Sequence, residues 1–243
     1  MKAYGISDKG AVRGENQDCF RIKVLDGAAV AALVLCDGMG GESSGGLAAA
    51  VAADAFMAHA ALCMAEKDPP SLAVTARESA SYANICVFDR SRSEEACAGM
   101  GTTLVGLLVR GQELALVNVG DSRCYRWSGG QLVQLTQDHS LVADLLARGV
   151  IGREEAHHHP RRNVITRAIG LEYRVKSDVF QPDLAEGDWL MLCSDGLTNT
   201  LEESTVAGLL AAHGEPEEAC AALLQAALDA GAADNVTVMI FCR

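Results

Sequence analysis

The chain has 243 residues, 49% of them hydrophobic, and a formal net charge of -12. This length allows one large domain with a buried core, and the hydrophobic content excludes a disordered chain. The negative charge disfavours nucleic acid and an anionic membrane surface as main partners, because both attract positive charge.

The nine cysteines are scattered and never form a Cys-x-x-Cys pair. Several lie in apolar runs such as "LVLCD" and "LMLCS", which is typical of buried thiols in a reducing compartment rather than of disulfides or a zinc site. The start "MKAYGISDKG" lacks the apolar core of a secretory signal. The Ala-rich stretch 46–65 is long, but Asp54 and His59 interrupt it. We therefore expect a cytoplasmic protein without a membrane-spanning segment.

Apolar runs and the turn and capping residues between them predict the elements. In chain order these are strands at 18–25 and 30–36, helices at 43–65 and 71–90, strands at 102–109, 113–119, 122–127 and 131–135, a helix at 139–148, strands at 163–168, 175–181 and 188–194, helices at 202–212 and 215–230, and a strand at 236–242. "RGQE" (110–113) and "WSGGQ" (127–131) are typical of hairpin turns between antiparallel strands. Because strands and helices do not alternate regularly, we expect one α+β domain, 1–243, of antiparallel sheets covered by helices.

Aspartates stand at the ends of the predicted core strands. They are Asp18, Asp37, Asp121, Asp195 and Asp234, and glycine adjoins three of them. Any one of these could be an ordinary turn residue, since Asp and Gly favour turns. As a set they would repel one another unless cations or protons neutralised them. Oxygen ligands without paired Cys or His indicate Mg²⁺ or Mn²⁺, and two such ions sharing a carboxylate would activate water for attack on phosphorus.

An anionic substrate requires a basic residue beside these carboxylates. Arg13 lies five residues before Asp18 in "VRGENQD" and can share the same rim. Its planar guanidinium matches the geometry of a phosphate group. The alternative is an ordinary exposed arginine.

At these residues the sequence resembles the metal-dependent type 2C family of Ser/Thr protein phosphatases, in its bacterial branch. The motifs that carry the resemblance are "RGENQD" (13–18), "LCDGMGG" (35–41), "GTTL" (101–104), "VGDSRCYR" (119–126), "LTQDHS" (135–140), "NVITRAIG" (163–170), "CSDGL" (193–197) and "DNVTV" (234–238). The resemblance implies a four-layer α-β-β-α sandwich of two antiparallel sheets flanked by helices.

The resemblance also implies the roles of the site residues. Asp37 bridges two Mn²⁺ or Mg²⁺ ions, with the Gly38 carbonyl completing one site and Asp195 and Asp234 the other. Asp18 acts on the first ion largely through bound water, and a third ion uses Asp121 and Asp195. Arg13 grips the phosphate, and a metal-bridging water attacks phosphorus without a covalent phosphoenzyme. The partners implied are phosphorylated proteins and a cognate Ser/Thr kinase, and the chain is expected to act as a monomer.

The chain departs from the family pattern at three places. Gln17 replaces a frequent glutamate, which removes one acidic group near the cations. Met39 stands where many eukaryotic members have a histidine proposed as general acid, so the leaving alkoxide must take its proton from water or another group. Gly45-Gly46 replaces Gly-Glu, which can alter the start of the first helix.

The segment 139–170 matches the flap beside the family's active site. Its many arginines, including Arg161 and Arg162, suggest a role in selecting phosphorylated substrates, and a merely solvated loop is the equal alternative. The consecutive histidines 157–159 are better explained as a solvated loop than as a metal site. His139 follows a strand and opens a helix that Asp138 or Ser140 could cap, which favours a structural role.

Two other functions fit the fold. A non-catalytic member could bind phosphoproteins as a scaffold, although no metal aspartate is missing. A phosphatase of small phosphate esters is also compatible, because the motifs handle phosphate rather than the rest of the substrate.

Overall fold

The computed structural model describes residues 1–25, 29–40, 44–152, 155–156 and 159–243. The strands are β1 (Lys2–Asp8), β2 (Asp18–Leu25), β3 (Val30–Met39), β4 (Gly101–Thr102), β5 (Leu104–Arg110), β6 (Glu113–Val119), β7 (Arg123–Ser128), β8 (Gln131–Gln134), β9 (Asp178–Phe180), β10 (Trp189–Cys193) and β11 (Val236–Cys242). The helices are α1 (Ser44–Met64), α2 (Leu72–Ser93), α3 (Leu141–Ala147), α5 (Asp195–Thr198), α6 (Glu203–Ala212) and α7 (Pro216–Asp229), with a 3₁₀ turn, η2, at Glu95–Cys97.

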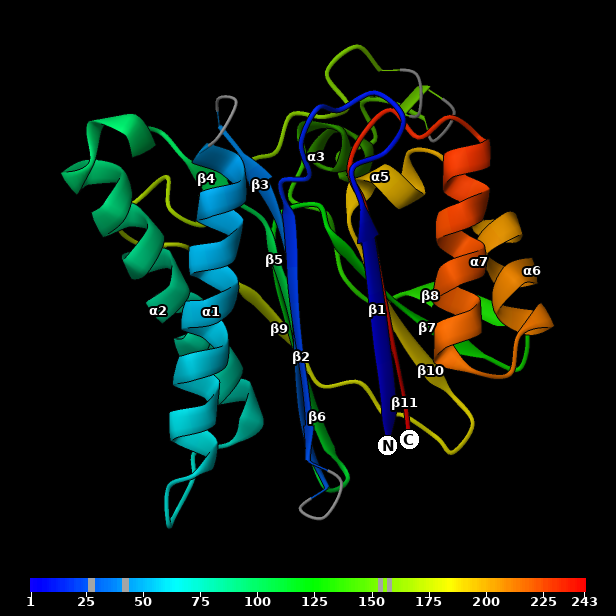
Figure 1. Cartoon of the computed structure of the whole chain (residues 1–243), viewed down its shortest axis with the longest axis horizontal. Coiled ribbons are helices and arrows are strands. Elements are labelled where there is room, and N and C mark those ends of the chain that lie inside the picture. Colours follow the sequence, from blue (N-terminus) through cyan, green and yellow to red (C-terminus); the bar gives the residue numbers. More distant parts are fainter. Residues whose placement is uncertain (26–28, 41–43, 153–154, 157–158) are drawn as a thin grey trace.

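The strands form two sheets, and every pairing within them is antiparallel. One sheet has the order β1-β11-β10-β7-β8, and the other has β2-β3-β5-β6-β9, with β4 paired to β3. In Figure 1 the sheets face each other, with α1 and α2 outside the second sheet and α6 and α7 outside the first. The four-layer α-β-β-α arrangement expected from the resemblance is therefore confirmed.

Three apolar clusters hold these layers together. The first joins α1 and α2 to β3, β5 and β6, the second joins α6 and α7 to β10 and β11, and the third lies between the sheets. Phe56 of α1 lies over Gly106 of β5, where a Cβ would come within 2.7 Å of the phenyl ring. The close approach of helix and sheet thus depends on glycine at 106.

Helix α1 is the one helix in the described part of the chain that is long and apolar enough to cross a membrane. Several of its alanines, among them Ala48, Ala52 and Ala53, are fully buried against β3 and α2. Its apolar composition is accounted for by this position between the sheet and α2.

Most predicted elements are confirmed within a few residues. Both hairpin turns are present, because Arg110 pairs with Glu113 and Ser128 with Gln131. The first helix starts at Ser44, and residue 43 lies outside the described residues. The strand predicted at 175–181 shortens to β9, and the one predicted at 163–168 is wrong. There the chain makes only isolated bridges, Ile165 with Ser140 and Ile169 with Thr102, so its apolar residues close a loop instead of joining a sheet.

Strand β1 was not predicted. It pairs along its length with β11, from Lys2 opposite Cys242 to Asp8 opposite Val236. Gly5 interrupts its pattern, and a Cβ there would lie 2.8 Å from the Phe20 ring and 2.9 Å from Met239. Gly5 makes the strand hard to recognise from the sequence, yet the packing of β1 against the other sheet requires it.

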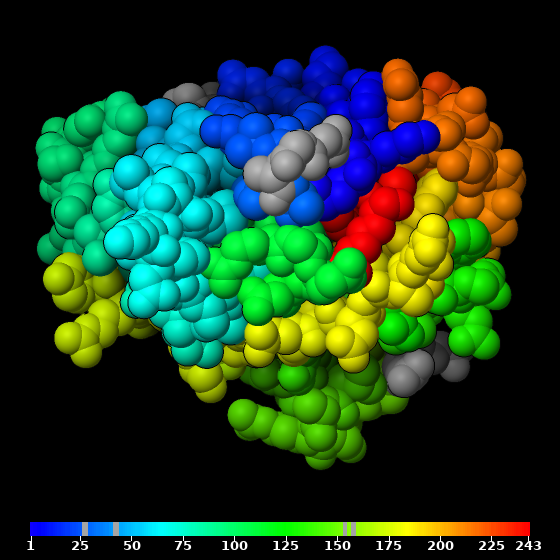
Figure 2. Space-filling model, turned by 90° about the horizontal axis from the view of Figure 1, so that it is seen from below, coloured from blue at the N-terminus to red at the C-terminus, as the bar shows by residue number. Residues whose placement is uncertain are grey.

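The chain termini lie together at the lower end of the molecule in Figure 1. Figure 2 views this end, where the 110–113 turn (green) lies beside the C-terminal segment (red). Arg243 ties them by donating to the Gln112 side chain at 2.7 Å and to the Leu184 carbonyl at 3.1 Å. The loops around β4, α3 and α5, which carry several of the motifs that resemble the family, gather at the opposite, upper end of Figure 1.

Candidate active site

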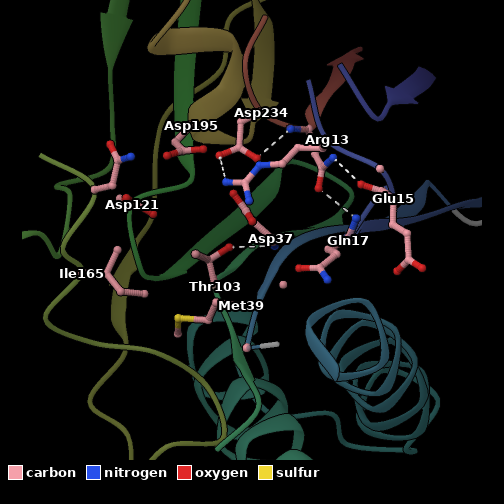
Figure 3. A pocket seen from close by; sticks show the side chains of 15 residues that line it. Arg13, Glu15, Gln17, Asp37, Met39, Thr103, Asp121, Ile165, Asp195 and Asp234 are labelled. Atoms are coloured by element: carbon pink, nitrogen blue, oxygen red, sulfur yellow. Dashed lines mark hydrogen bonds and ion pairs between the residues drawn. The ribbon is translucent and has the colours of Figure 1, made fainter. Parts of the chain in front are cut away.

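A cavity of about 690 Å³ opens at the upper end of the sheets. Its lining includes four of the predicted aspartates, Asp37, Asp121, Asp195 and Asp234. In Figure 3 their carboxylates converge on one space, with Arg13 reaching over it. Asp37 comes from β3 of one sheet, whereas Asp195 and Asp234 adjoin β10 and β11 of the other. The site therefore lies at the seam between the sheets.

Asp37 is held within its strand rather than beyond it, because β3 continues to Met39. Its backbone N–H donates to Thr103 Oγ1 at 2.9 Å, and its carbonyl accepts from Thr102 Oγ1 at 2.8 Å. Thr103 Oγ1 in turn lies 2.7 Å from Ser122 Oγ. Buried threonines behind Asp37 thus fix the backbone that presents its carboxylate. Both threonines belong to the "GTTL" motif, to which the sequence alone assigned no role in the site.

Gly38 has a packing reason for lacking a side chain. A Cβ there would overlap the Gly45 carbonyl at the start of α1 and lie 2.7 Å from the Gln17 carbonyl oxygen. Gly45 in turn has Gln17 Oε1 only 2.5 Å from its own Cβ position. The glycines let α1 begin directly against β3 and the Gln17 loop. Gly46 lies in the first turn of α1 without preventing the helix from forming.

Asp18 is directly opposite Asp37 in the β2–β3 pairing. One of its oxygens, Oδ2, accepts from Ser194 Oγ at 2.8 Å and from Thr237 Oγ1 at 2.6 Å. The other, Oδ1, is buried and has no hydrogen-bond partner. A buried carboxylate oxygen without a donor is costly, so this atom is suited to a cation or to water held by one.

Asp195 opens the short helix α5 and accepts from Asn199 Nδ2 at 2.9 Å. Asp121 occupies the turn after β6. Gly196 fits against the Asn235 carbonyl, where a Cβ would overlap it. The "DG" pair at 195–196 thus brings α5 onto the 234–235 loop and places Asp195 beside Asp234.

Arg13 and Asp234 form an ion pair, with Nη2 to Oδ2 at 2.8 Å. The arginine side chain is 56% exposed and comes from the 9–17 loop. Asn235 anchors this loop, since it accepts from Gln17 N at 2.9 Å and donates to the carbonyls of Lys9 and Glu15. The sequence did not single out Asn235, although it stands in the "DNVTV" motif.

The clustered carboxylates resist ionisation. Burial, with the neighbouring Asp195 and Asp234, raises the pKa of Asp18 to about 7 even though two hydroxyls donate to it. Burial and Asp195 raise the pKa of Asp121 to about 7. Burial and the surrounding aspartates raise the pKa of Asp37 well above its ordinary value, and burial with Asp234 raises that of Asp195. Although Arg13 and Arg123 lie nearby, these four carboxyls still have raised pKa values, so a cation would stabilise the site.

The chemistry of the donors fits hard divalent cations. The carboxylate oxygens, the orphaned Asp18 Oδ1 and the neighbouring backbone offer oxygen alone, which suits Mg²⁺ and Mn²⁺. Among the described residues, no three His, Cys, Asp or Glu side chains already close around one point. An open arrangement of this kind leaves coordination positions for water and substrate.

The predicted flap supplies Asn163 and Ile165 to the cavity wall. Ile165 bridges to Ser140, and Thr166 N donates to the His139 carbonyl at 2.7 Å, so the two ends of the flap are joined. Ser140 caps α3 by accepting from Ala143 N at 3.2 Å, whereas Asp138 pairs with Arg123. Of the 157–159 histidines, residues 157 and 158 lie outside the described residues. His159 Nδ1 accepts from Arg161 N at 3.1 Å.

A carboxylate cavity between two helix-covered antiparallel sheets, with an arginine on its rim, is the arrangement expected of an enzyme that acts on phosphate groups. The family profile described as Protein phosphatase 2C matches residues 11–230. The chain is 36% identical over 250 residues to the serine/threonine phosphatase stp of Listeria monocytogenes, covering 100% of this chain and 96% of that protein.

Solved structures agree. The serine/threonine phosphatase Stp1 from Staphylococcus aureus superposes with a TM-score of 0.91 at 34% identity, covering 100% of this chain and 94% of that one. The catalytic domain of PstP in complex with 2 manganese ions gives 0.81 at 32% identity, covering 98% and 96%. The chain therefore belongs to the protein phosphatase 2C family and is an enzyme that dephosphorylates proteins.

Proposed function

We propose that this serine/threonine protein phosphatase hydrolyses phosphoserine and phosphothreonine by direct attack of water, using divalent cations held by the converging aspartates. The observation that carries the proposal is the meeting of Asp37, Asp121, Asp195 and Asp234 in one cavity, with the orphaned oxygen of Asp18 behind them. The relative solved with 2 manganese ions supports this cation chemistry. Divalent cations supply charge neutralisation and Lewis-acid activation of water.

The proposed ligands are those expected from the resemblance. Asp37, the Gly38 carbonyl and Asp18 would hold one Mn²⁺ or Mg²⁺ ion, and Asp37, Asp195 and Asp234 would hold a second. Asp121 and Asp195 would hold a third. Asp37 lies between Asp18 on β2 and the aspartates beside β10 and β11, which suits a ligand shared by two ions. Asp18 lies opposite Asp37, and its Oδ1 atom has no hydrogen-bond partner.

Arg13 binds the phosphate group of the substrate. Its half-exposed side chain rests on Asp234 at the cavity rim, so only part of its donor fork is used. The remaining N–H groups can donate charge-assisted hydrogen bonds to a tetrahedral anion. Asn235 keeps the 9–17 loop in place, which holds the guanidinium over the carboxylates.

Met39 lines the cavity, and no histidine is found among its described lining residues. The proton for the leaving alkoxide is therefore taken from water or from a group other than histidine. We also retain the organisation as one catalytic domain, 1–243, with a flap at about 139–170. Further parts of the proposal are a monomeric state, a cognate kinase as partner and a cytoplasmic location. All nine cysteines are free thiols, which supports a reducing compartment.

The decisive experiment combines catalysis with cation binding. We expect a phosphothreonine peptide to be hydrolysed with Mn²⁺ and not with chelator. Asp37→Asn should lose both turnover and high-affinity Mn²⁺ binding in calorimetry, because it removes the shared charge. Asp68→Asn, on the exposed turn after α1, is the matched control and should behave as the unmodified chain. Full turnover by Asp37→Asn would refute the cation mechanism. Absence of turnover with any phosphopeptide or simple ester would favour the scaffold alternative, and turnover of esters alone would favour a small-molecule phosphatase.

A further inference from the structure

A second cavity, of about 900 Å³, adjoins the catalytic one. The two share Asp121 and Asp195 as lining residues, so they lie side by side. Its walls are α3 of the flap, the β7–β8 hairpin and the segment from α5 to the start of α6. We call this surface the flap groove. It is the continuation of the active site on the side of the third predicted cation.

The floor of the flap groove is apolar. Val142 and Val206 are buried, and Leu132 and Leu201 are half-buried. At its edges Val133 of β8 is 45% exposed and Leu146 of α3 is 37% exposed. An apolar floor beside a catalytic cavity can take up an apolar side chain of the substrate.

The two long walls differ in charge. On the α6 side, Glu202 and Glu203 are adjacent and exposed, and no ion pair to either is found among the described residues. Glu203 only accepts a long contact from Tyr125 Oη at 3.4 Å. The flap side carries Arg162. Asp138, at the inner end, is already paired with Arg123 at 2.6 Å. Within the described part of the chain, the α6 wall is therefore the acidic side of the groove for which no ion pair is found.

We propose that the flap groove binds the substrate polypeptide beside the phosphorylated residue and selects segments that place an apolar residue on the floor and a lysine or arginine against Glu202 and Glu203. This inference rests on the proposed function, because it takes the phosphorylated residue to occupy the catalytic cavity. The occupant is a polypeptide because the enzyme acts on proteins. An extended chain advances about 3.3 Å per residue, so the residues next to the phosphorylated one enter the adjoining groove.

A charge-reversal experiment tests the acidic wall. Two phosphothreonine peptide libraries, identical except for lysine or glutamate at the flanking positions, are compared by kcat/KM. The unmodified chain should prefer lysine by roughly threefold to tenfold, the range of one or two exposed charge pairs. The double variant Glu202→Lys/Glu203→Lys should lose or invert that preference. Its matched control is Glu217→Lys/Glu218→Lys, the equivalent acidic pair in the first turn of α7, which should keep it.

A second variant tests the floor. Leu146→Asp should lower kcat/KM severalfold for peptides with an apolar flanking residue and leave peptides with serine there unchanged. Leu62→Asp, an exposed leucine of α1, is the control. Hydrolysis of p-nitrophenyl phosphate, which is too small to fill the groove, should be the same in all variants.

The outcomes separate the two proposals. A lysine preference that survives in Glu202→Lys/Glu203→Lys overturns the groove inference, while turnover of the phosphothreonine peptides themselves still supports the proposed function. Equal kcat/KM for both libraries in the unmodified chain overturns it as well. Absence of phosphopeptide turnover by the unmodified chain would instead contradict the proposed function. Circular dichroism identifies a variant that fails to fold. If Glu202→Lys/Glu203→Lys fails to fold, Glu202→Gln/Glu203→Gln is used instead, and it should abolish the lysine preference without inverting it.

Discussion

His139 and the backbone of Gly120 are joined by two hydrogen bonds, one through the imidazole ring and one through the His139 backbone. Gly120 N donates to His139 Nδ1 at 3.0 Å, and His139 N donates to the Gly120 carbonyl at 2.9 Å. Because Nδ1 accepts, the neutral ring carries its proton on Nε2, which lies 3.1 Å from Asp178 Oδ2. Burial lowers the pKa of His139, which favours this neutral form. Gly120 precedes Asp121 and His139 begins the flap, so one side chain positions both.

We expect His139→Ala to release the Asp121 turn and the base of the flap together. It should lower kcat and weaken Mn²⁺ binding about tenfold, the lower end of the effect of removing an outer partner of a metal ligand. His139→Asn, whose amide oxygen can replace Nδ1 as acceptor, should recover part of both. His59→Ala removes a histidine that contacts Ser79 between α1 and α2, and it should change neither. Calorimetric Mn²⁺ titration and amide hydrogen exchange of residues 139–170 give the result. Unchanged Mn²⁺ affinity in His139→Ala would contradict the positioning role.

Replacement of Gly38 by alanine should destabilise the fold. The added Cβ overlaps the Gly45 carbonyl, which is backbone and cannot rotate away, so we expect a loss of about 2 kcal/mol or more in the free energy of unfolding. Gly208→Ala is the contrasting change, since nothing lies within 4 Å of its Cβ position in α6. It should gain about 0.5–1 kcal/mol through helix propensity. Urea denaturation measures both, and equal stability of the two variants would be the contrary result.

The stability of the chelated protein should fall as pH rises from about 4 to 7. The pKa values of Asp18 and Asp121 rise from 3.8 to about 7 in the folded chain, mainly because of burial. In this window the folded state holds protons that the unfolded state has lost, so raising the pH favours unfolding. Thermal denaturation across the window should show a falling Tm with chelator. The fall should be shallower in Asp121→Asn and opposed by Mn²⁺, which binds the ionised carboxylates. A chelated protein whose Tm rises steadily through the window would refute the mutual strain of these carboxyls.

Arg13→Lys should separate phosphate binding from cation binding. Lysine keeps the charge but loses the planar fork, so we expect KM for a phosphopeptide and the inhibition constant of inorganic phosphate to rise about tenfold. Mn²⁺ affinity should stay nearly constant, because the charge opposite Asp234 is preserved. Arg21→Lys, whose partner Asp54 lies on α1, is the control. If Mn²⁺ affinity changed as much as phosphate affinity, Arg13 would act on the metal site instead.

The sequence was informative wherever chemistry and local pattern coincide. Asp37 and Asp195 follow uninterrupted apolar runs, and the two hairpin turns have glycine in the loop, so their places could be predicted. The β1 strand could not, because Gly5 is dictated by Phe20 of the opposite sheet, a contact between distant parts of the chain. Ile165 was assigned to a strand because its neighbours are apolar, yet its partner is Ser140 at the other end of the flap.

Other site features depend on the same distant contacts. Asn235 acts through three backbone groups of the 9–17 loop, and nothing in its local sequence shows this. The flap groove joins α3, the β7–β8 hairpin and α6, which are separated by long stretches of chain. Residue type and spacing reveal such a surface only after the sheets are assembled.

The placement of the cavity at the seam couples its occupancy to the whole fold. Asp18 and Asp37 belong to one sheet, whereas Asp195 and Asp234 adjoin the interior strands β10 and β11 of the other. The Asp18 carboxylate already crosses the seam, since it accepts hydrogen bonds from Ser194 and Thr237. A ligand that contacts the aspartates of both sheets would therefore link the two sheets to each other. Cation binding should therefore slow the hydrogen exchange of backbone amides in both β3 and β10, including amides that do not contact the ligand.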